Sequence, residues 1–286
     1  MLKWGLFLLI SLIWGSSFLL MLKGMEHFSP WQVAATRLFF GGVVLWPLAA
    51  GAYRRIPKDK LRLVVVSGFL ASFIPAFLFC IAETRLESSF AGMLNALTPV
   101  FVIIVGALFF NAKARTGQVI GVLVSLCGCV GLFLSKNSST GELLFAGFVL
   151  LATICYGLNV NMVSKKLAGI APLDLISFAF ALMAVPALLI MIFTGTFSAD
   201  YSSLPVLKSA GAMVLLGVLG TAGGNILFYI LLRRAGGIFA STVTYGIPFV
   251  AIFFGWLVYR ETQNIYGWIS MVVILAGIFI ANLTRK

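Results

Sequence analysis

Long apolar stretches separated by short polar connections run from one end of the chain to the other. Each stretch is close to the ~20 residues that an α-helix needs to cross the ~30 Å hydrocarbon core of a bilayer. Continuous apolar runs of this length predict helices, since the strands of a membrane β-barrel alternate apolar and polar side chains over ~10 residues. The pattern predicts an all-α polytopic membrane protein with ten transmembrane helices, at residues 4–22, 30–50, 62–82, 90–111, 116–135, 142–164, 172–194, 209–231, 236–259 and 264–284.

A second pattern is internal repetition. Four residues have matching positions 142 residues later, namely Trp14, Gly15, Lys23 and Pro30, which correspond to Tyr156, Gly157, Lys165 and Pro172. Four others recur 149 residues later, namely Phe90, Ala91, Pro99 and Gly106, which correspond to Phe239, Ala240, Pro248 and Gly255. Each copy carries five spans, an odd number, so the second copy crosses the membrane in the opposite sense. We therefore predict two inverted five-helix repeats, residues 1–138 and 139–286, around a central cavity, as in many secondary transporters.

The composition supports a membrane protein and the charge distribution predicts its orientation. Hydrophobic residues make up 61% of the chain and charged residues only 10%, whereas roughly a quarter of a soluble domain is charged. The net charge of +12 does not predict nucleic-acid binding, because most basic residues outside the spans lie on the side of both termini. By the positive-inside rule that side is cytoplasmic. It holds Lys3, Arg54, Arg55, Lys58, Lys60, Arg62, Lys113, Arg115, Lys165, Lys166, Arg233, Arg234, Arg285 and Lys286, against Lys23, Arg85, Lys136, Lys208 and Arg260 opposite.

Polar side chains near the middle of several spans are the candidates for a substrate site, because a solute that has shed water needs polar groups at that depth. The repeat register pairs Ser17 with Asn159, Ser72 with Thr221, and Asn95 with Thr244. Such matching favours one site on the pseudo-symmetry axis, although Ser, Thr and Asn also join membrane helices through interhelical hydrogen bonds. The predicted substrate-binding residues are Trp14, Ser17, Ser72, Asn95, Thr98, Tyr156, Asn159, Thr221, Asn225, Tyr229, Thr244 and Tyr245.

Glycines and prolines at corresponding depths predict hinges. Pro99 and Pro248 each leave a carbonyl group unsatisfied in the preceding turn, so the fourth and ninth spans are expected to bend. Gly220 and Gly224 make the eighth span small and easily distorted. Paired hinges at paired depths suit the rocking of one repeat against the other.

Charged residues are rare within the spans. Arg37 lies about two turns into the second span, and Ala179 takes the matching place in the other copy. An intramembrane arginine is costly and usually paired or functional, so Arg37 is expected to bind a substrate anion or to make structural bonds. No carboxylate lies at mid-span, which favours a facilitator or exchanger that does not require a proton gradient. The alternative is that an acid at the end of a span, Glu83 or Glu142, is drawn inward and titrates.

The sequence offers little for other functions. The four cysteines have no metal-like spacing and the single histidine lies in a connection, so we expect neither a metal nor a cofactor. A membrane enzyme would need a nucleophile with a base, or a metal cluster, and a channel would need a ring of like groups. A membrane-embedded sensor or scaffold and a membrane enzyme remain as alternatives. The expected partners are a small-molecule substrate and the lipid bilayer; the oligomeric state stays open, since a monomer suffices for a pathway.

Several segments together resemble the drug/metabolite transporter superfamily, in its bacterial EamA-domain branch. They are Trp14-Gly15-Ser16-Ser17-Phe18 through Lys23, then Pro30, Ala34-Ala35-Thr36-Arg37-Leu38-Phe39 and Leu97-Thr98-Pro99, with a weaker second copy. The resemblance implies a secondary transporter of small metabolites such as amino acids or related amphipathic solutes, acting mostly as an exporter by alternating access in the cytoplasmic (inner) membrane of a bacterium.

One position departs from the resemblance. The family typically has a Gly-Glu pair after the fourth span, where this chain reads Asn111-Ala112-Lys113. The second copy keeps the acid, as Glu261.

Overall fold

The computed structural model describes residues 2–112, 115–135, 140–262 and 264–283, and within them the chain is helical with short connections. The first half contains α1 (Leu2–Met25), α2 (Pro30–Arg55), α3 (Leu61–Gly68), α4 (Ile74–Ala82), α5 (Ser88–Asn95), α6 (Thr98–Phe110) and α7 (Thr116–Ser135). The second half contains α8 (Thr140–Lys166), α9 (Pro172–Phe193), α10 (Leu204–Leu215), α11 (Gly224–Ala235), α12 (Gly237–Ser241), α13 (Gly246–Tyr259) and α14 (Ile265–Leu283).

Within the described residues these helices form ten apolar segments, which confirms the predicted all-α membrane fold class. Eight are long and apolar enough to cross a bilayer, and the other two are the shorter apolar stretches Thr116–Leu132 and Ile265–Ala281. Four of the ten are built from two helices each, namely α3 with α4, α5 with α6, α10 with α11, and α12 with α13. The predicted boundary between the repeats, at residues 138 and 139, lies outside the described residues.

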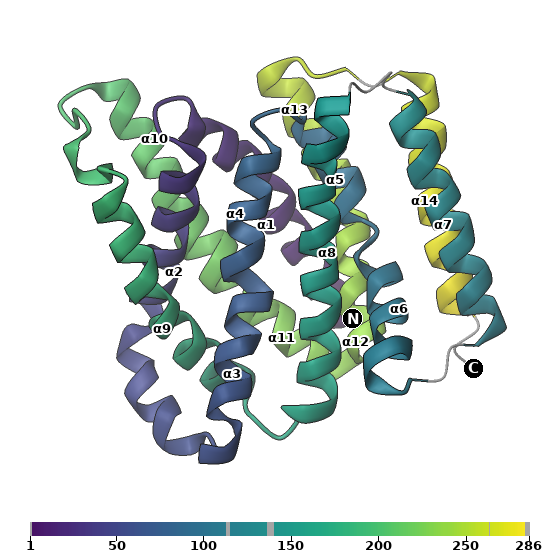
Figure 1. The fold of residues 1–286 in the computed structure, drawn as a ribbon, viewed down its shortest axis with the longest axis horizontal. Coiled ribbons are helices and arrows are strands. Elements are labelled where there is room, and N and C mark those ends of the chain that lie inside the picture. Colours follow the sequence, from purple (N-terminus) through teal and green to yellow (C-terminus); the bar gives the residue numbers. More distant parts are fainter. Residues whose placement is uncertain (1, 113–114, 136–139, 263, 284–286) are drawn as a thin grey trace.

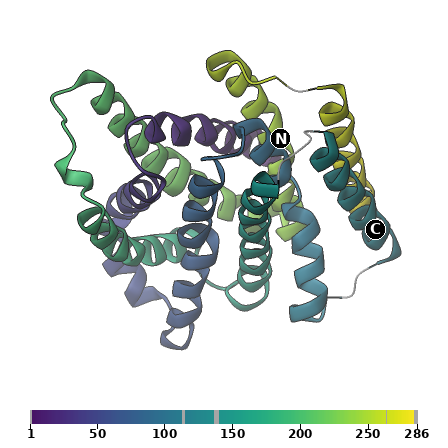
Figure 2. The same cartoon turned by 45° about the horizontal axis from the view of Figure 1, so that its top comes forward.

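The two halves are interleaved. α2 packs along α9, α7 packs along α14, and α1 packs between α13 and the α10–α11 segment of the other half. In the corresponding way α8 packs against α6 and α4 of the first half. Figures 1 and 2 show the α7–α14 pair at one edge of the bundle and the α2–α9 pair near the other. The contacts of α1 and α8 thus correspond when the halves are exchanged, as two-fold pseudo-symmetry requires.

Small residues bring the paired helices together. A Cβ atom added at Gly42 of α2 would lie 2.3 Å from the carbonyl oxygen of Phe180 in α9. At Gly121 of α7 it would lie 2.3 Å from the carbonyl oxygen of Gly277 in α14. In lipid the hydrophobic effect does not drive helices together, so they associate through van der Waals packing, and small residues allow their backbones to approach closely.

The crossing segments are interrupted at equivalent depths in the two halves. Between α3 and α4 the residues Phe69–Phe73 form a π-helix, and between α10 and α11 the residues Leu216–Gly223 do the same. In the 149-residue register the first π-helix falls within the second. A π-turn lengthens each hydrogen-bonded ring and leaves local carbonyl groups free, and it often marks a functional position.

The fourth and ninth spans are broken rather than bent at their prolines. The chain leaves the α-helix at residues 96 and 97 between α5 and α6, and it forms a 3₁₀ turn at Thr242–Tyr245 between α12 and α13. Pro99 is the second residue of α6 and Pro248 the third of α13. A proline in the first turn of a helix loses no hydrogen bond, because those N–H groups have no partner within the helix. The prolines therefore begin the second half-helix.

The helix ends define two sides of the bundle. Figure 1 shows the start of α1 and the end of α14 toward the same end as the connections α2–α3, α6–α7 and α8–α9. We call this the termini side, and the other end, with the connections α1–α2, α4–α5, α9–α10 and α13–α14, the opposite side. Of the basic residues used to predict orientation, Lys113, Lys136, Arg285 and Lys286 lie outside the described residues.

Candidate substrate cavity

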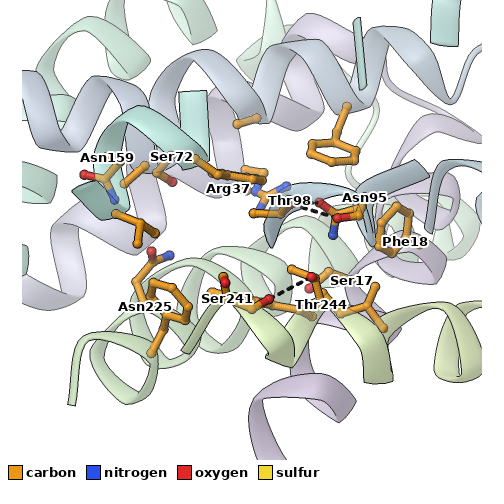
Figure 3. Close-up of a pocket in the computed structure, with 18 of the residues that line it drawn as sticks. Ser17, Phe18, Arg37, Ser72, Asn95, Thr98, Asn159, Asn225, Ser241 and Thr244 are labelled. Carbon is orange, nitrogen blue, oxygen red and sulfur yellow. Dashed lines mark hydrogen bonds between the residues drawn. The ribbon is translucent and has the colours of Figure 1, made fainter. Parts of the chain in front are cut away.

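A cavity of about 80 Å³ lies in the middle of the bundle, where the interrupted segments meet. Figure 3 shows polar side chains from several helices arranged around it, with Asn159 and Asn225 toward one end and Asn95 and Phe18 toward the other. The lining residues are Trp14, Ser17, Phe18, Met21, Arg37, Ala71, Ser72, Ala76, Phe79, Asn95, Thr98, Tyr156, Asn159, Val160, Asn225, Phe228, Ser241, Thr244 and Ile247. Both halves of the chain contribute to the wall.

Most of the residues predicted from the sequence meet at this cavity. Nine of the twelve line it, namely Trp14, Ser17, Ser72, Asn95, Thr98, Tyr156, Asn159, Asn225 and Thr244. Thr221 is buried beside the wall, and its hydroxyl accepts a hydrogen bond from Arg37 Nε at 3.1 Å. Tyr229 lies behind Asn159, and Tyr245 packs against the apolar core. In the sequence, a polar residue that lies one position away from the cavity wall cannot be distinguished from a polar residue that lines the wall.

The apolar part of the wall could not be predicted from the sequence. Phe18, Met21, Phe79 and Phe228 line the cavity, but apolar residues fill every span and the side chain that faces a cavity looks like one that faces lipid. Ser241 was overlooked although it is a hydroxyl residue in the ninth span. Its carbonyl oxygen accepts a hydrogen bond from Thr244 Oγ1 at 2.8 Å, one of the contacts drawn in Figure 3.

Some polar groups of the wall are used by the protein and others are not. Thr98 Oγ1 donates to the Asn95 backbone oxygen at 2.7 Å, and Asn225 Nδ2 donates to the Thr221 backbone oxygen at 2.8 Å. Among the described residues, no partner is found for the Asn95 amide nitrogen, the Asn225 amide oxygen or the Tyr156 hydroxyl. Two amides and a phenol thus offer both donors and acceptors to a bound solute.

Trp14 connects α1 to the π-helix of the other half. Its indole Nε1 donates to the carbonyl oxygen of Gly220 at 3.0 Å. A Cβ atom at Gly224 would lie 2.4 Å from Trp14 Nε1, and one at Gly220 would lie 2.8 Å from Ser17 Oγ. Both glycines therefore allow α1 to approach this segment, and the tryptophan bonds a carbonyl group within it.

Arg37 makes structural contacts at the cavity wall. Its Nε donates to Thr221 Oγ1 at 3.1 Å and its Nη1 lies 3.3 Å from Met21 Sδ. The side chain thereby joins α2 to α1 and to the second π-helix. Ala179, which takes the place of Arg37 in the other half, is fully buried. A Cβ atom added at Gly68 would lie 2.9 Å from the Cβ of Ala179. The structure supports the structural interpretation of Arg37 and leaves the anion-binding one as a prediction.

A buried polar network closes the cavity toward the termini side. Asn159 Nδ2 donates to the Tyr229 hydroxyl at 2.7 Å, and Ser67 Oγ donates to Asn159 Oδ1 at 2.7 Å. The Ser67 and Tyr229 oxygens are 3.3 Å apart. The three residues come from α8, α11 and α3, so this network links three crossing segments.

Toward the opposite side lie an aromatic contact of the cavity wall and a helix cap. The rings of Phe18 and Phe79 meet edge to face, with centroids 5.7 Å apart. Glu261, in the connection after α13, accepts hydrogen bonds at 3.0 Å from the backbone nitrogens of Ser88 and Ser89, the first residues of α5. A carboxylate there satisfies two unpaired N–H groups and complements the helix dipole. Ala112 is the residue of the first copy that corresponds to Glu261. Because alanine has no carboxylate, the second copy supplies this cap and the first copy has no equivalent one.

Two further features concern metals and cysteines. Within the described residues, no group of three or more His, Cys, Asp or Glu side chains is placed to hold a metal ion. The four cysteines are free, and three of them are buried.

Ten apolar segments in two interleaved halves, with interrupted helices around one polar cavity, define a membrane transporter of the inverted-repeat class. More narrowly, the chain belongs to the EamA-like transporter family, whose sequence profile matches residues 2–134 and again 143–283. The protein is accordingly a multi-pass membrane transporter.

Three relatives agree in length, and two of them are named as transporters. The chain is 26% identical to protein PagO of Salmonella typhimurium over 98% of this chain and 93% of that protein. It is 23% identical to the uncharacterized transporter YoaV of Bacillus subtilis, covering 96% and 94%, and to the uncharacterized inner membrane transporter YedA of Escherichia coli, covering 98% and 90%. A solved crystal structure with 19% identity has a TM-score of 0.67 over 97% of this chain and 95% of its own, which supports the fold.

Proposed function

We propose that the protein carries small amphipathic metabolites, such as amino acids or related solutes, outward across the cytoplasmic (inner) membrane of a bacterium. The observation that carries this proposal is the central cavity, where apolar aromatic walls adjoin parts of two amides and one hydroxyl group that have no partner among the described residues. An amphipathic solute satisfies both kinds of surface. The outward direction rests on the resemblance to exporters of the superfamily.

The proposed mechanism is alternating access about hinges in the interrupted segments. The π-helices and the breaks in the fourth and ninth spans occur at matching depths on either side of the cavity. Irregular backbone within a membrane is tolerated where it lines a cavity, and it is where carriers bend. Gly220 and Gly224 at the second π-helix, and Pro99 and Pro248 at the starts of α6 and α13, are the proposed hinge residues.

We expect the termini side to face the cytoplasm. Lys58 lies in the exposed α2–α3 connection and Ser202 in the exposed α9–α10 connection on the opposite side. In a background without the four native cysteines, Ser202→Cys should react with an impermeant thiol reagent added to intact cells, and Lys58→Cys should react only after the membrane is permeabilised. Labelling of Lys58→Cys alone in intact cells would reverse the orientation.

Removing polar groups of the wall that have no partner among the described residues should weaken substrate binding. Asn95→Ala, Asn225→Ala and Tyr156→Phe each delete one such group, so each loses one substrate hydrogen bond. Such a loss is about 0.5–1.5 kcal/mol, or roughly two- to tenfold in affinity. Tyr156→Phe should leave stability unchanged, whereas Asn225→Ala also removes the bond to the Thr221 backbone oxygen at 2.8 Å and Asn95→Ala the contact with Thr98 Oγ1 at 3.3 Å. Solute counterflow in proteoliposomes measures the affinity, and thermal unfolding in detergent measures stability. Wild-type counterflow in all three variants would remove this cavity as the binding site.

A further inference from the structure

The carboxyl group of Glu83 is buried on the opposite side of the bundle without a hydrogen-bond partner. Glu83 directly follows the last residue of α4 and is only 5% exposed. Neither of its carboxyl oxygens has a partner among the described residues. An ionised carboxylate in such a place loses its hydration and receives no hydrogen bond in return, so it binds a proton instead. The arrangement in this structure therefore favours the neutral form of Glu83 over the ionised form.

The groups around Glu83 come from several elements. Two charged residues act on Glu83, the negative Glu261 in the connection after α13 and the positive Arg37 in α2. Its titratable neighbours are Cys80 in α4 and Tyr259 at the end of α13. Burial, and then the charge of Glu261, raises the pKa of Glu83 well above its ordinary value, and Arg37 lowers it by a smaller amount. Three more charged residues share its surface hollow, namely Glu26, Arg85 and Glu87.

Glu83 lines a surface hollow on the opposite side and lies one helical turn from a residue of the cavity wall. This open hollow of about 580 Å³ is also lined by Leu22, Met25 and Leu86. Phe79, one turn before Glu83, lines the central cavity, and its ring meets that of Phe18 edge to face. A passage from the cavity to the hollow has to separate these side chains, and water entering that passage would hydrate Glu83.

We propose that Glu83 is the proton-binding site of the outer gate, taking a proton from the external solution as the gate closes and returning it there as the gate opens. The proposal rests on the alternating-access function proposed above. According to this proposal, the external pH regulates the opening of the gate. Transport is not coupled to a proton gradient. Glu83 also differs from Glu142, which lies half-buried in the first turn of α8.

The sign of the pH effect follows from linkage. In the open gate Glu83 is hydrated and its pKa returns toward the ordinary value of about 4.3. In the closed gate its pKa is higher, so the closed form is favoured at low pH and loses this advantage as pH rises through the closed-state pKa. Between the two pKa values, the ratio of open to closed gates rises by about tenfold per pH unit.

Cysteine accessibility tests the proposal without any substrate. Ala76 is 2% exposed and lines the cavity two turns before Glu83 on the same helix. In the background without native cysteines, Ala76→Cys is labelled from outside with an impermeant thiol reagent, with and without Glu83→Gln. The ratio of the two rates at each pH cancels the effect of pH on thiolate content. We expect that ratio to rise as the pH is raised above the ordinary pKa of about 4.3, by up to about tenfold per pH unit, and Glu83→Asp to retain a pH dependence. An equal pH profile with Glu and Gln would overturn the proposal.

Two controls separate gating from structural and coupling roles. Because glutamine mimics the neutral acid, Glu83→Gln should be as stable as the wild type at low pH and more stable at high pH; lower stability at low pH would contradict the proposal. Substrate counterflow at equal pH should proceed with no net proton movement reported by a trapped pH dye. A proton flux in fixed ratio to turnover, lost in Glu83→Gln, would make Glu83 a coupling site and overturn the gate. Failure of transport alone would leave the labelling result intact.

Discussion

Replacing Gly224 by alanine should reduce transport about tenfold or more and lower the stability of the protein. The new Cβ atom would lie 2.4 Å from Trp14 Nε1 and 3.0 Å from its Cδ1. Real Cβ atoms do not approach so closely, so the indole must move, and its hydrogen bond to the carbonyl oxygen of Gly220 would be lost. Overpacking of this kind costs about 1–3 kcal/mol. Proteoliposome counterflow and thermal unfolding in detergent measure the two effects.

The matched control is Gly211→Ala, in α10 of the same crossing segment. No atom lies within 4 Å of a Cβ placed at Gly211, and alanine favours a helix over glycine by about 1 kcal/mol. Gly211→Ala should therefore leave transport unchanged. A double-mutant cycle with Trp14→Ala identifies the cause, because Gly224→Ala should cost less once the indole is absent. If Gly224→Ala lowers stability equally with Trp14 and with Trp14→Ala, a clash with the indole is not the reason that position 224 requires glycine.

The sequence predicted the spans because membrane thickness controls the length of an apolar run. The ten segments and their pairing across two halves follow from hydropathy and from the 142- and 149-residue offsets. The kind of interruption could not be predicted. Proline suggested a bend at Pro99 and Pro248, but the backbone leaves the α-helix two to three residues before Pro99 and three to six residues before Pro248, because a proline is best placed in the first turn of the helix that follows.

The sequence could indicate which face of a helix lies toward the cavity, but not which residues of that face line it. Polar residues are scarce in these spans, so nine of the twelve candidates line the cavity. Glu83 shows what a linear pattern leaves open: it ends the third span, where acids are normally solvated, yet the packing of α4 against its neighbours buries it. Whether a residue at the end of a span faces water or protein depends on contacts with helices distant in the sequence.

Replacing Tyr229 by phenylalanine should lower stability, whereas the same change at Tyr156 should not. The Tyr229 hydroxyl accepts the hydrogen bond of Asn159 Nδ2 at 2.7 Å and lies 3.3 Å from Ser67 Oγ. Hydrogen bonds between membrane helices average about 0.6 kcal/mol, but a buried amide left without a partner costs about 1–3 kcal/mol. The Tyr156 hydroxyl has no partner among the described residues to lose, so Tyr156→Phe should affect substrate affinity only.

A third tyrosine controls for the loss of a phenol that is bonded outside the cavity. The Tyr201 hydroxyl donates to the Thr196 backbone oxygen at 2.6 Å in the α9–α10 connection. Tyr201→Phe should produce a small loss of stability and normal transport, whereas Tyr229→Phe should reduce both, because its network joins α3, α8 and α11 where the cavity closes toward the termini side. If Tyr229→Phe unfolds at the wild-type temperature and transports normally, the network does not hold that end of the cavity closed.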